Sequence, residues 1–100
     1  MEGDDAGEKG IEWDDDKAET NHRKHGVTFE EAKTVFQDPL SLTVPDPRHS
    51  WGEIRNLHIG LSVEGRLLIV VYVEKQATIR LISSREATRE ERRLYEEGAY

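Results

Sequence analysis

Lys24, His25 and Gly26 stand together where one predicted helix ends and the next begins. Thr28 and Glu31 follow at the spacing of a capping box, so the second helix starts directly after the glycine. The corner between the two helices therefore holds a cation, an imidazole and a flexible backbone position. Because histidine changes its charge near neutral pH, this corner suits proton transfer or the binding of a phosphate.

Two arginines in the second half of the chain are candidates for holding a phosphate. Arg80 lies inside a predicted strand between apolar neighbours, where its guanidinium needs an anionic partner. The structural alternative for Arg80 is an ion pair with a carboxylate such as Glu53, and the residues alone favour that alternative. Arg85 precedes a predicted helix N-terminus, where backbone donors and the helix dipole attract anions. The structural alternative for Arg85 is that it is an ordinary exposed cation without a ligand.

A metal site is a weaker interpretation of the histidines. His22 and His25 are spaced i,i+3 on the first predicted helix, and Asp46 and His49 extend the set of ligand types. No spacing in the chain fixes a third ligand. We therefore predict no metal and no cofactor.

The large aromatic residues have two interpretations each. Trp13 and Trp51 can stack on bases, but a chain with only 7% aromatic residues needs them for packing. Tyr72 lies in the predicted central strand, where core packing or a supporting hydrogen bond is expected. Tyr95 follows Arg92 by three residues in the last predicted helix and can face either the core or a site.

Alternating and helical patterns predict the elements that position these residues. The predicted fold is α+β: two N-terminal helices, a four-stranded antiparallel meander and a C-terminal helix. The two N-terminal helices end near His25 and before Asp38, and residues 11–13 alternate in a way that allows a short edge strand. The predicted strands cover residues 40–44, 57–63, 66–73 and 77–83, and the last helix runs from Thr88 to near Gly98.

Composition limits the class of protein. One hundred residues suit a single domain, and only 35% of them are apolar, so the core must be thin. There is no cysteine, which excludes disulfides and thiolate metal sites. The longest apolar run, residues 67–73, is far shorter than the roughly 20 residues that cross a bilayer. We predict a cytoplasmic protein that does not contact a membrane.

The acidity of the chain is confined to its beginning. The first twenty residues carry nine acidic side chains and two lysines, which accounts for the whole net charge of −7. Residues 1–10 are expected to be a disordered acidic leader, and residues 11–100 a single domain. An acidic total therefore does not exclude RNA as a substrate, because local basic clusters decide phosphate binding.

Five short motifs occur in order along the chain: Trp-Asp-x-x-Lys (13–17), Asn-x-x-Lys-His-Gly-Val (21–27), Phe-x-x-Ala-x-x-Val-Phe (29–36), Arg-x-Ile-Ser-x-Arg-x-Ala-Thr (80–88) and Glu-Arg-x-x-Tyr-Glu (91–96). Together they resemble the BrnT family, toxins of type II toxin–antitoxin pairs, over residues 11–98. The resemblance implies a RelE-like fold and an endoribonuclease that cleaves RNA without a metal ion and so inhibits translation. It also implies a BrnA-like ribbon-helix-helix antitoxin in a 2:2 assembly, which binds operator DNA through the antitoxin and represses its own operon.

The chain departs from the family pattern before the second predicted strand. Many members have a Gly-Glu-Glu-Arg-Trp-like sequence there. In this chain Glu53, Arg55 and Gly60 match, whereas Ile54 and Asn56 stand at the positions of the second acid and the tryptophan. The predicted RNA-binding set is Arg55, Arg80, Arg85 and Tyr95.

Metal-free RNA cleavage makes specific demands on side chains. The neighbouring 2′-hydroxyl is the nucleophile, so the reaction needs a base, cations on the phosphorane and an acid for the leaving 5′-oxygen. Lys24 or His25 can serve as acid or base, and Glu53 can orient groups or accept a proton. Arg80 and Arg85 can hold the phosphate. Two rival hypotheses remain: a non-catalytic module that acts only as co-repressor with the antitoxin, and a general α+β domain without a toxin role.

Overall fold

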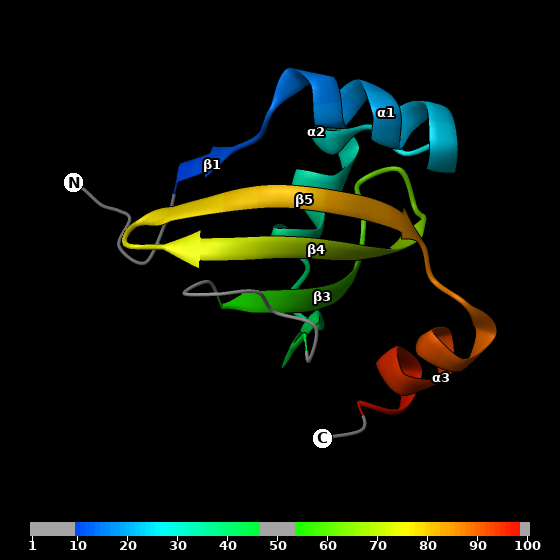
Figure 1. Cartoon of the computed structure of the whole chain (residues 1–100). Helices are drawn as coiled ribbons and strands as arrows, with labels where there is room; N and C mark the ends of the chain where they lie inside the picture. Colours follow the sequence, from blue (N-terminus) through cyan, green and yellow to red (C-terminus); the bar gives the residue numbers. More distant parts are fainter. Residues whose placement is uncertain (1–9, 47–53, 99–100) are drawn as a thin grey trace.

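Five strands form one mixed sheet in a computed structural model that describes residues 10–46 and 54–98 (Figure 1). The spatial order is β1-β5-β4-β3-β2, with β1 parallel to β5 and the other neighbours antiparallel. The strands are β1 (Gly10–Glu12), β2 (Leu42–Pro45), β3 (Arg55–Leu61), β4 (Leu67–Lys75) and β5 (Thr78–Glu86). The nearly continuous apolar run of β4 occupies the middle of the sheet, as expected for a strand covered on both faces.

The predicted four-stranded antiparallel sheet is wrong in the number of strands and in the direction of one pairing. Residues 10–12 form β1, which pairs in parallel with the start of β5 and joins Ile11 to Ile79. The alternation of residues 11–13 allows a short edge strand, but three residues are too few to indicate its partner or its direction. Its partner lies more than sixty residues away in the chain, and no local signal encodes that pairing.

Within residues 10–46 and 54–98, three α-helices and one 3₁₀ segment accompany the sheet. The α-helices are α1 (Asp15–His25), α2 (Phe29–Ala32) and α3 (Arg89–Glu97), and the 3₁₀ segment η2 (Lys33–Gln37) follows α2 directly. Asp14 caps α1 by accepting a hydrogen bond from the Lys17 backbone N–H at 3.1 Å, and Gly26 ends the helix with φ of 72°. No helix of the described residues has the length and apolar character needed to span a bilayer.

The second N-terminal helix was predicted as one regular helix, and this prediction is wrong. Only α2 is α-helical, because Thr34 interferes with the helical hydrogen bonds. The Thr34 hydroxyl donates to the Glu31 carbonyl at 2.7 Å and accepts from the Val63 backbone N–H at 3.0 Å. A threonine that bonds back to the preceding turn competes with the helix, and here it also ties the segment to the β3–β4 hairpin.

The two faces of the sheet carry two apolar clusters. On the face covered by α1 and α2, residues of α2, of the turn before it and of η2 (Val27, Phe29, Ala32 and Val35) pack on residues of the sheet (Leu68, Val70, Tyr72 and Leu81). On the opposite face, Ile59, Leu67 and Ile69 form a smaller cluster that Ala87 and Tyr95 partly cover. We call this second side the α3 face, defined by Leu67, Ile69, Val71 and Val73 of β4.

Candidate functional site

Arg55 and Arg80 lie in one cross-strand row. Arg80 pairs with Val73 of β4, and Val73 pairs in turn with Arg55 of β3. Directly paired residues point to the same side of a sheet, so the two arginines flank Val73 on the α3 face. Two strand spacings separate their backbones, or about 10 Å. Two guanidinium groups from different strands therefore face the same side.

Glu12 is the carboxylate beside Arg80. The Arg80 Nε and Nη2 atoms both lie 3.2 Å from Glu12 Oε2, and the two side chains are 50% and 52% exposed. An ion pair as exposed as this contributes about 0–1 kcal/mol, so a phosphate can compete for the guanidinium. The sequence suggested a carboxylate such as Glu53 as the partner of Arg80, but Glu53 lies outside the described residues. Glu12 was missed because its position depends on the unpredicted parallel pairing of β1.

Arg55 retains hydrogen-bonding capacity. Its side chain is half-buried, and its buried Nε atom has no hydrogen-bond partner within residues 10–46 and 54–98. An unsatisfied buried donor costs about 1–3 kcal/mol, so an acceptor that reaches this guanidinium is favoured.

Arg85 is held by a carboxylate of α3. Its Nη1 and Nη2 atoms lie 2.8 and 2.9 Å from the two carboxylate oxygens of Glu91, and Nη1 also donates to the Glu86 carbonyl. The hydrogen bonds from Arg85 lower the pKa of Glu91 to about 2. Glu91 also accepts from the Thr88 backbone N–H in a capping box. Arg85 thus joins β5 to α3, and part of its guanidinium is already occupied.

Tyr95 is bound to Asp38, which follows η2. The Tyr95 hydroxyl donates to Asp38 Oδ2 at 2.6 Å, and burial together with this acidic neighbour raises the pKa of Tyr95 to about 12. Burial opposes ionisation of Asp38, but hydrogen bonds from Tyr95 and from the backbone N–H groups of Leu61 and Leu40 outweigh it and lower the pKa of Asp38. Tyr95 therefore stays protonated and anchors α3 to the sheet.

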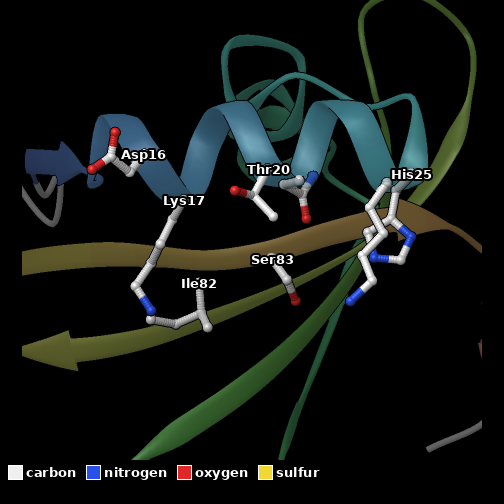
Figure 2. Close-up of a pocket in the computed structure, with 8 residues that line it drawn as sticks. Asp16, Lys17, Thr20, His25, Ile82 and Ser83 are labelled. Carbon is white, nitrogen blue, oxygen red and sulfur yellow. The ribbon is translucent and has the colours of Figure 1, made fainter.

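A groove of about 290 Å³ separates α1 from β5, and we call it the α1–β5 groove (Figure 2). Six of its lining residues are Lys17, Thr20, Lys24, His25, Ile82 and Ser83. In Figure 2 the Lys17 side chain descends from α1 toward Ile82, and the His25 ring lies at the opposite end of the helix. The predicted lysine–histidine corner is thus one end of a longer groove.

Asn21 holds the walls of this groove together. Its buried amide donates to the carbonyls of Val27 and Ser84 at 3.0 and 2.9 Å, and its Oδ1 accepts from the Ser84 backbone N–H at 3.0 Å. The side chain therefore occupies the outer hydrogen-bonding edge of β5 where β1 does not extend. This contact fixes α1 on the strand that carries the arginines.

Strand register connects the groove to the arginines. β5 contains an irregularity at Ile82: Leu81 pairs with Tyr72, whereas Ser83 pairs with Val71. Because Val71 and Val73 share the α3 face, Ser83 lies on the same side as Arg80 and also lines the groove with Lys24 and His25. Lys24 and His25 of α1 line this groove with Ser83, whereas Arg80 lies further back on β5 and lines a separate hollow with Glu12 and Val73. Lys17, Thr20 and Ser83 were not predicted, although Lys17 and Lys24 are spaced to share one helix face.

The remaining candidates have other surroundings. Trp13 packs edge-to-face on Phe29 with ring centroids 5.9 Å apart, and Tyr72 is buried against Phe36. Trp51 and His49 lie outside the described residues. Within residues 10–46 and 54–98, no three histidine, aspartate or glutamate side chains are grouped as metal ligands.

These features define a small α+β protein with basic residues along one strand and one helix edge. The chain belongs to the BrnT family: residues 13–91 match the family described as the ribonuclease toxin, BrnT, of type II toxin–antitoxin systems. No protein with a curated description matches the chain. Its fold is similar to the crystal structure of the Brucella abortus ribonuclease toxin, BrnT, with a TM-score of 0.64 and 23% identity over 81% of this chain and 99% of that chain.

Proposed function

We propose that this chain is a metal-independent endoribonuclease that inhibits translation as the toxin of a type II pair. The observation that supports it best is the shared α3 face of Arg55, Arg80 and Ser83, because Ser83 also lines the groove that contains Lys24 and His25. Membership of a ribonuclease toxin family makes RNA the expected substrate.

In this proposal the 2′-hydroxyl of RNA attacks the adjacent phosphorus, and the bond to the 5′-oxygen breaks. Lys24 or His25 exchanges the protons, as the base for the 2′-hydroxyl or the acid for the leaving oxygen. Arg80 and Arg55 stabilise the extra negative charge of the phosphorane. Glu53 keeps its proposed role in orienting groups or accepting a proton.

Arg85 and Tyr95 are proposed to contact RNA away from the bond that breaks. Arg85 has N–H groups beyond those bound to Glu91, and its side chain is 41% exposed. The Tyr95 ring packs partly on the apolar cluster of the α3 face, and the part of the ring that stays exposed is proposed to contact a base or sugar. Both residues also hold α3 in position, so their loss is expected to affect structure as well as binding.

The toxin family also supports a protein partner. We propose a BrnA-like ribbon-helix-helix antitoxin in a 2:2 assembly, which represses its own operon through the antitoxin's contact with operator DNA. The RelE-like fold and the cytoplasmic location expected from the sequence belong to the same proposal.

Cleavage and toxicity test the function directly. The purified chain is expected to degrade single-stranded RNA in the presence of a chelator, and its expression alone should arrest bacterial growth. Co-expression of the antitoxin should restore growth. Normal growth at verified soluble expression, together with intact RNA, would instead support a non-catalytic co-repressor.

A further inference from the structure

The two ends of the α1–β5 groove carry different cations. His25 and Lys24 belong to the last turn of α1, whereas Lys17 belongs to its first turns. Seven residues separate the two lysines, which corresponds to about 10 Å along the helix axis. In Figure 2 the Lys17 side chain points toward Ile82, and Thr20 and Ser83 are drawn between it and the His25 ring. One phosphate at the His25 end therefore leaves Lys17 free for another.

We propose that the Lys17 end of the groove binds a second backbone phosphate of single-stranded RNA, next to the phosphate that is cleaved. This inference rests on the proposed function for the identity of the substrate. The hydroxyls of Thr20 and Ser83 lie between the two cationic ends, where they can hydrogen-bond the intervening ribose. The groove then holds one nucleotide unit by its sugar and its two phosphates, without reading the base.

Lys17 is available for such a contact. Its side chain is exposed, and within the described ranges it forms no ion pair. Another cation of the same helix differs, because Arg23 pairs with Glu19 at 3.7 Å. The Asn21 bonds to Ser84 fix the helix on β5, so the Lys17 backbone has a set position relative to Ser83. A fixed backbone lowers the cost of bringing the Lys17 ammonium group to a phosphate.

Replacement of Asp16 is expected to change RNA binding in the opposite direction to replacement of Lys17. It also lines the groove, and its carboxylate repels a phosphate bound by the neighbouring Lys17. Asp15 is exposed in the same turn but does not line the groove. Removing the charge of Asp16 should therefore strengthen RNA binding more than removing the charge of Asp15.

Binding of a mixed-sequence, single-stranded 2′-O-methyl RNA to the full chain tests this subsite. The blocked 2′-oxygen prevents cleavage, so affinity is measured independently of activity. Each phosphate contact adds about 0.7 to the slope of log Kobs against log salt concentration for single strands. We expect Lys17→Ala to weaken binding and to lower the magnitude of this slope by about 0.7. Asp16→Asn should strengthen binding relative to Asp15→Asn.

Lys33→Ala is the matched control, because Lys33 lies on η2 and pairs with Glu30 outside the groove. It should leave the slope unchanged. A wild-type slope in Lys17→Ala, or no binding by the wild-type chain, overturns the subsite. Cleavage of unmodified RNA by the wild-type chain separates the subsite from the proposed ribonuclease activity. If the chain cleaves RNA but the salt slope does not depend on Lys17, only the subsite is overturned. A Lys17-dependent slope without cleavage supports the subsite and contradicts the ribonuclease.

Discussion

Arg80 and Glu12 occupy paired positions in the neighbouring parallel strands β5 and β1, with 3.2 Å between Arg80 Nη2 and Glu12 Oε2. The pair joins a residue near the start of the chain to β5, the strand that carries Arg80, Ser83 and Arg85. Both side chains are about half exposed, so the interaction is weak enough for a substrate phosphate to replace it. Glu12 thus orients Arg80 and also competes with the substrate for it.

Replacement of Glu12 by glutamine is therefore expected to strengthen RNA binding. The loss of an exposed pair releases Arg80 at a cost of no more than about 1 kcal/mol, which corresponds to an increase in affinity of up to about fivefold. The uncleavable RNA analogue provides the measurement. Glu19→Gln removes the partner of Arg23 on α1 and controls for net charge. Equal effects of the two variants would show that general charge, and not Arg80, is responsible.

Arg80→Ala is expected to reduce RNA cleavage by about 10²–10³-fold, because the loss of one donor to the developing charge costs about 2.7–4 kcal/mol. Circular dichroism should remain that of the wild type, since the Glu12 pair contributes little to stability. Arg89→Ala, an exposed change on α3, serves as control. An unfolded Arg80→Ala chain would mean that the ion pair is structural, and undiminished cleavage would remove Arg80 from the site.

The fold was predictable where its signals are local. The Asp14 cap, the Gly26 terminus and the Thr88–Glu91 capping box are short patterns, and the helices beside them are confirmed. The parallel pairing of β1 was not predictable as part of the sheet, because it depends on contacts between distant segments. The end of α2 was not predicted because Thr34 fits the helical pattern of the sequence. Its second hydrogen bond comes from the β3–β4 hairpin, which the local sequence does not indicate.

The candidate site was predictable in its residue types but not in its geometry. Lys24 and His25 follow from the helix corner, whereas their relation to Arg80 depends on the irregularity at Ile82. That irregularity turns Ser83 to the α3 face, and no sequence pattern marks it. Lys17 was overlooked because it becomes a groove residue only when Asn21 fixes α1 on β5.

A role for His25 in proton transfer predicts slower cleavage when its imidazole is removed. His25→Gln should lower the rate of RNA cleavage by about 10²–10⁴-fold, because glutamine can neither accept nor donate the proton that a general acid or base transfers. His22→Gln on the same helix is the control, since His22 does not line the groove. A chelator should leave the rate unchanged. An undiminished rate in His25→Gln would make Lys24 the better candidate. Loss of activity with the chelator, restored by zinc, would contradict the metal-free mechanism.

His58 predicts a loss of stability in mild acid. Its side chain is 7% exposed, its Nδ1 lies 2.6 Å from the Thr43 hydroxyl and its ring stacks on Phe36. Burial lowers the pKa of His58 below its ordinary value of 6.5 and outweighs the opposing charge of Asp38. The unfolded chain then binds more protons than the folded chain as the pH falls below about 6.5.

Stability should therefore be full above that pH and decrease below it, until the folded histidine also becomes protonated. The slope for one such group is at most about 1.4 kcal/mol per pH unit. Urea unfolding of the wild type and of His58→Gln between neutral pH and pH 5 measures the effect. Between neutral pH and pH 5, the free energy of unfolding of His58→Gln should depend much less on pH than that of the wild type, even if the variant is less stable at every pH. A control variant, His22→Gln, removes an exposed histidine and should keep the wild-type slope. Parallel pH profiles in the wild type and His58→Gln would mean that the buried imidazole does not control acid stability.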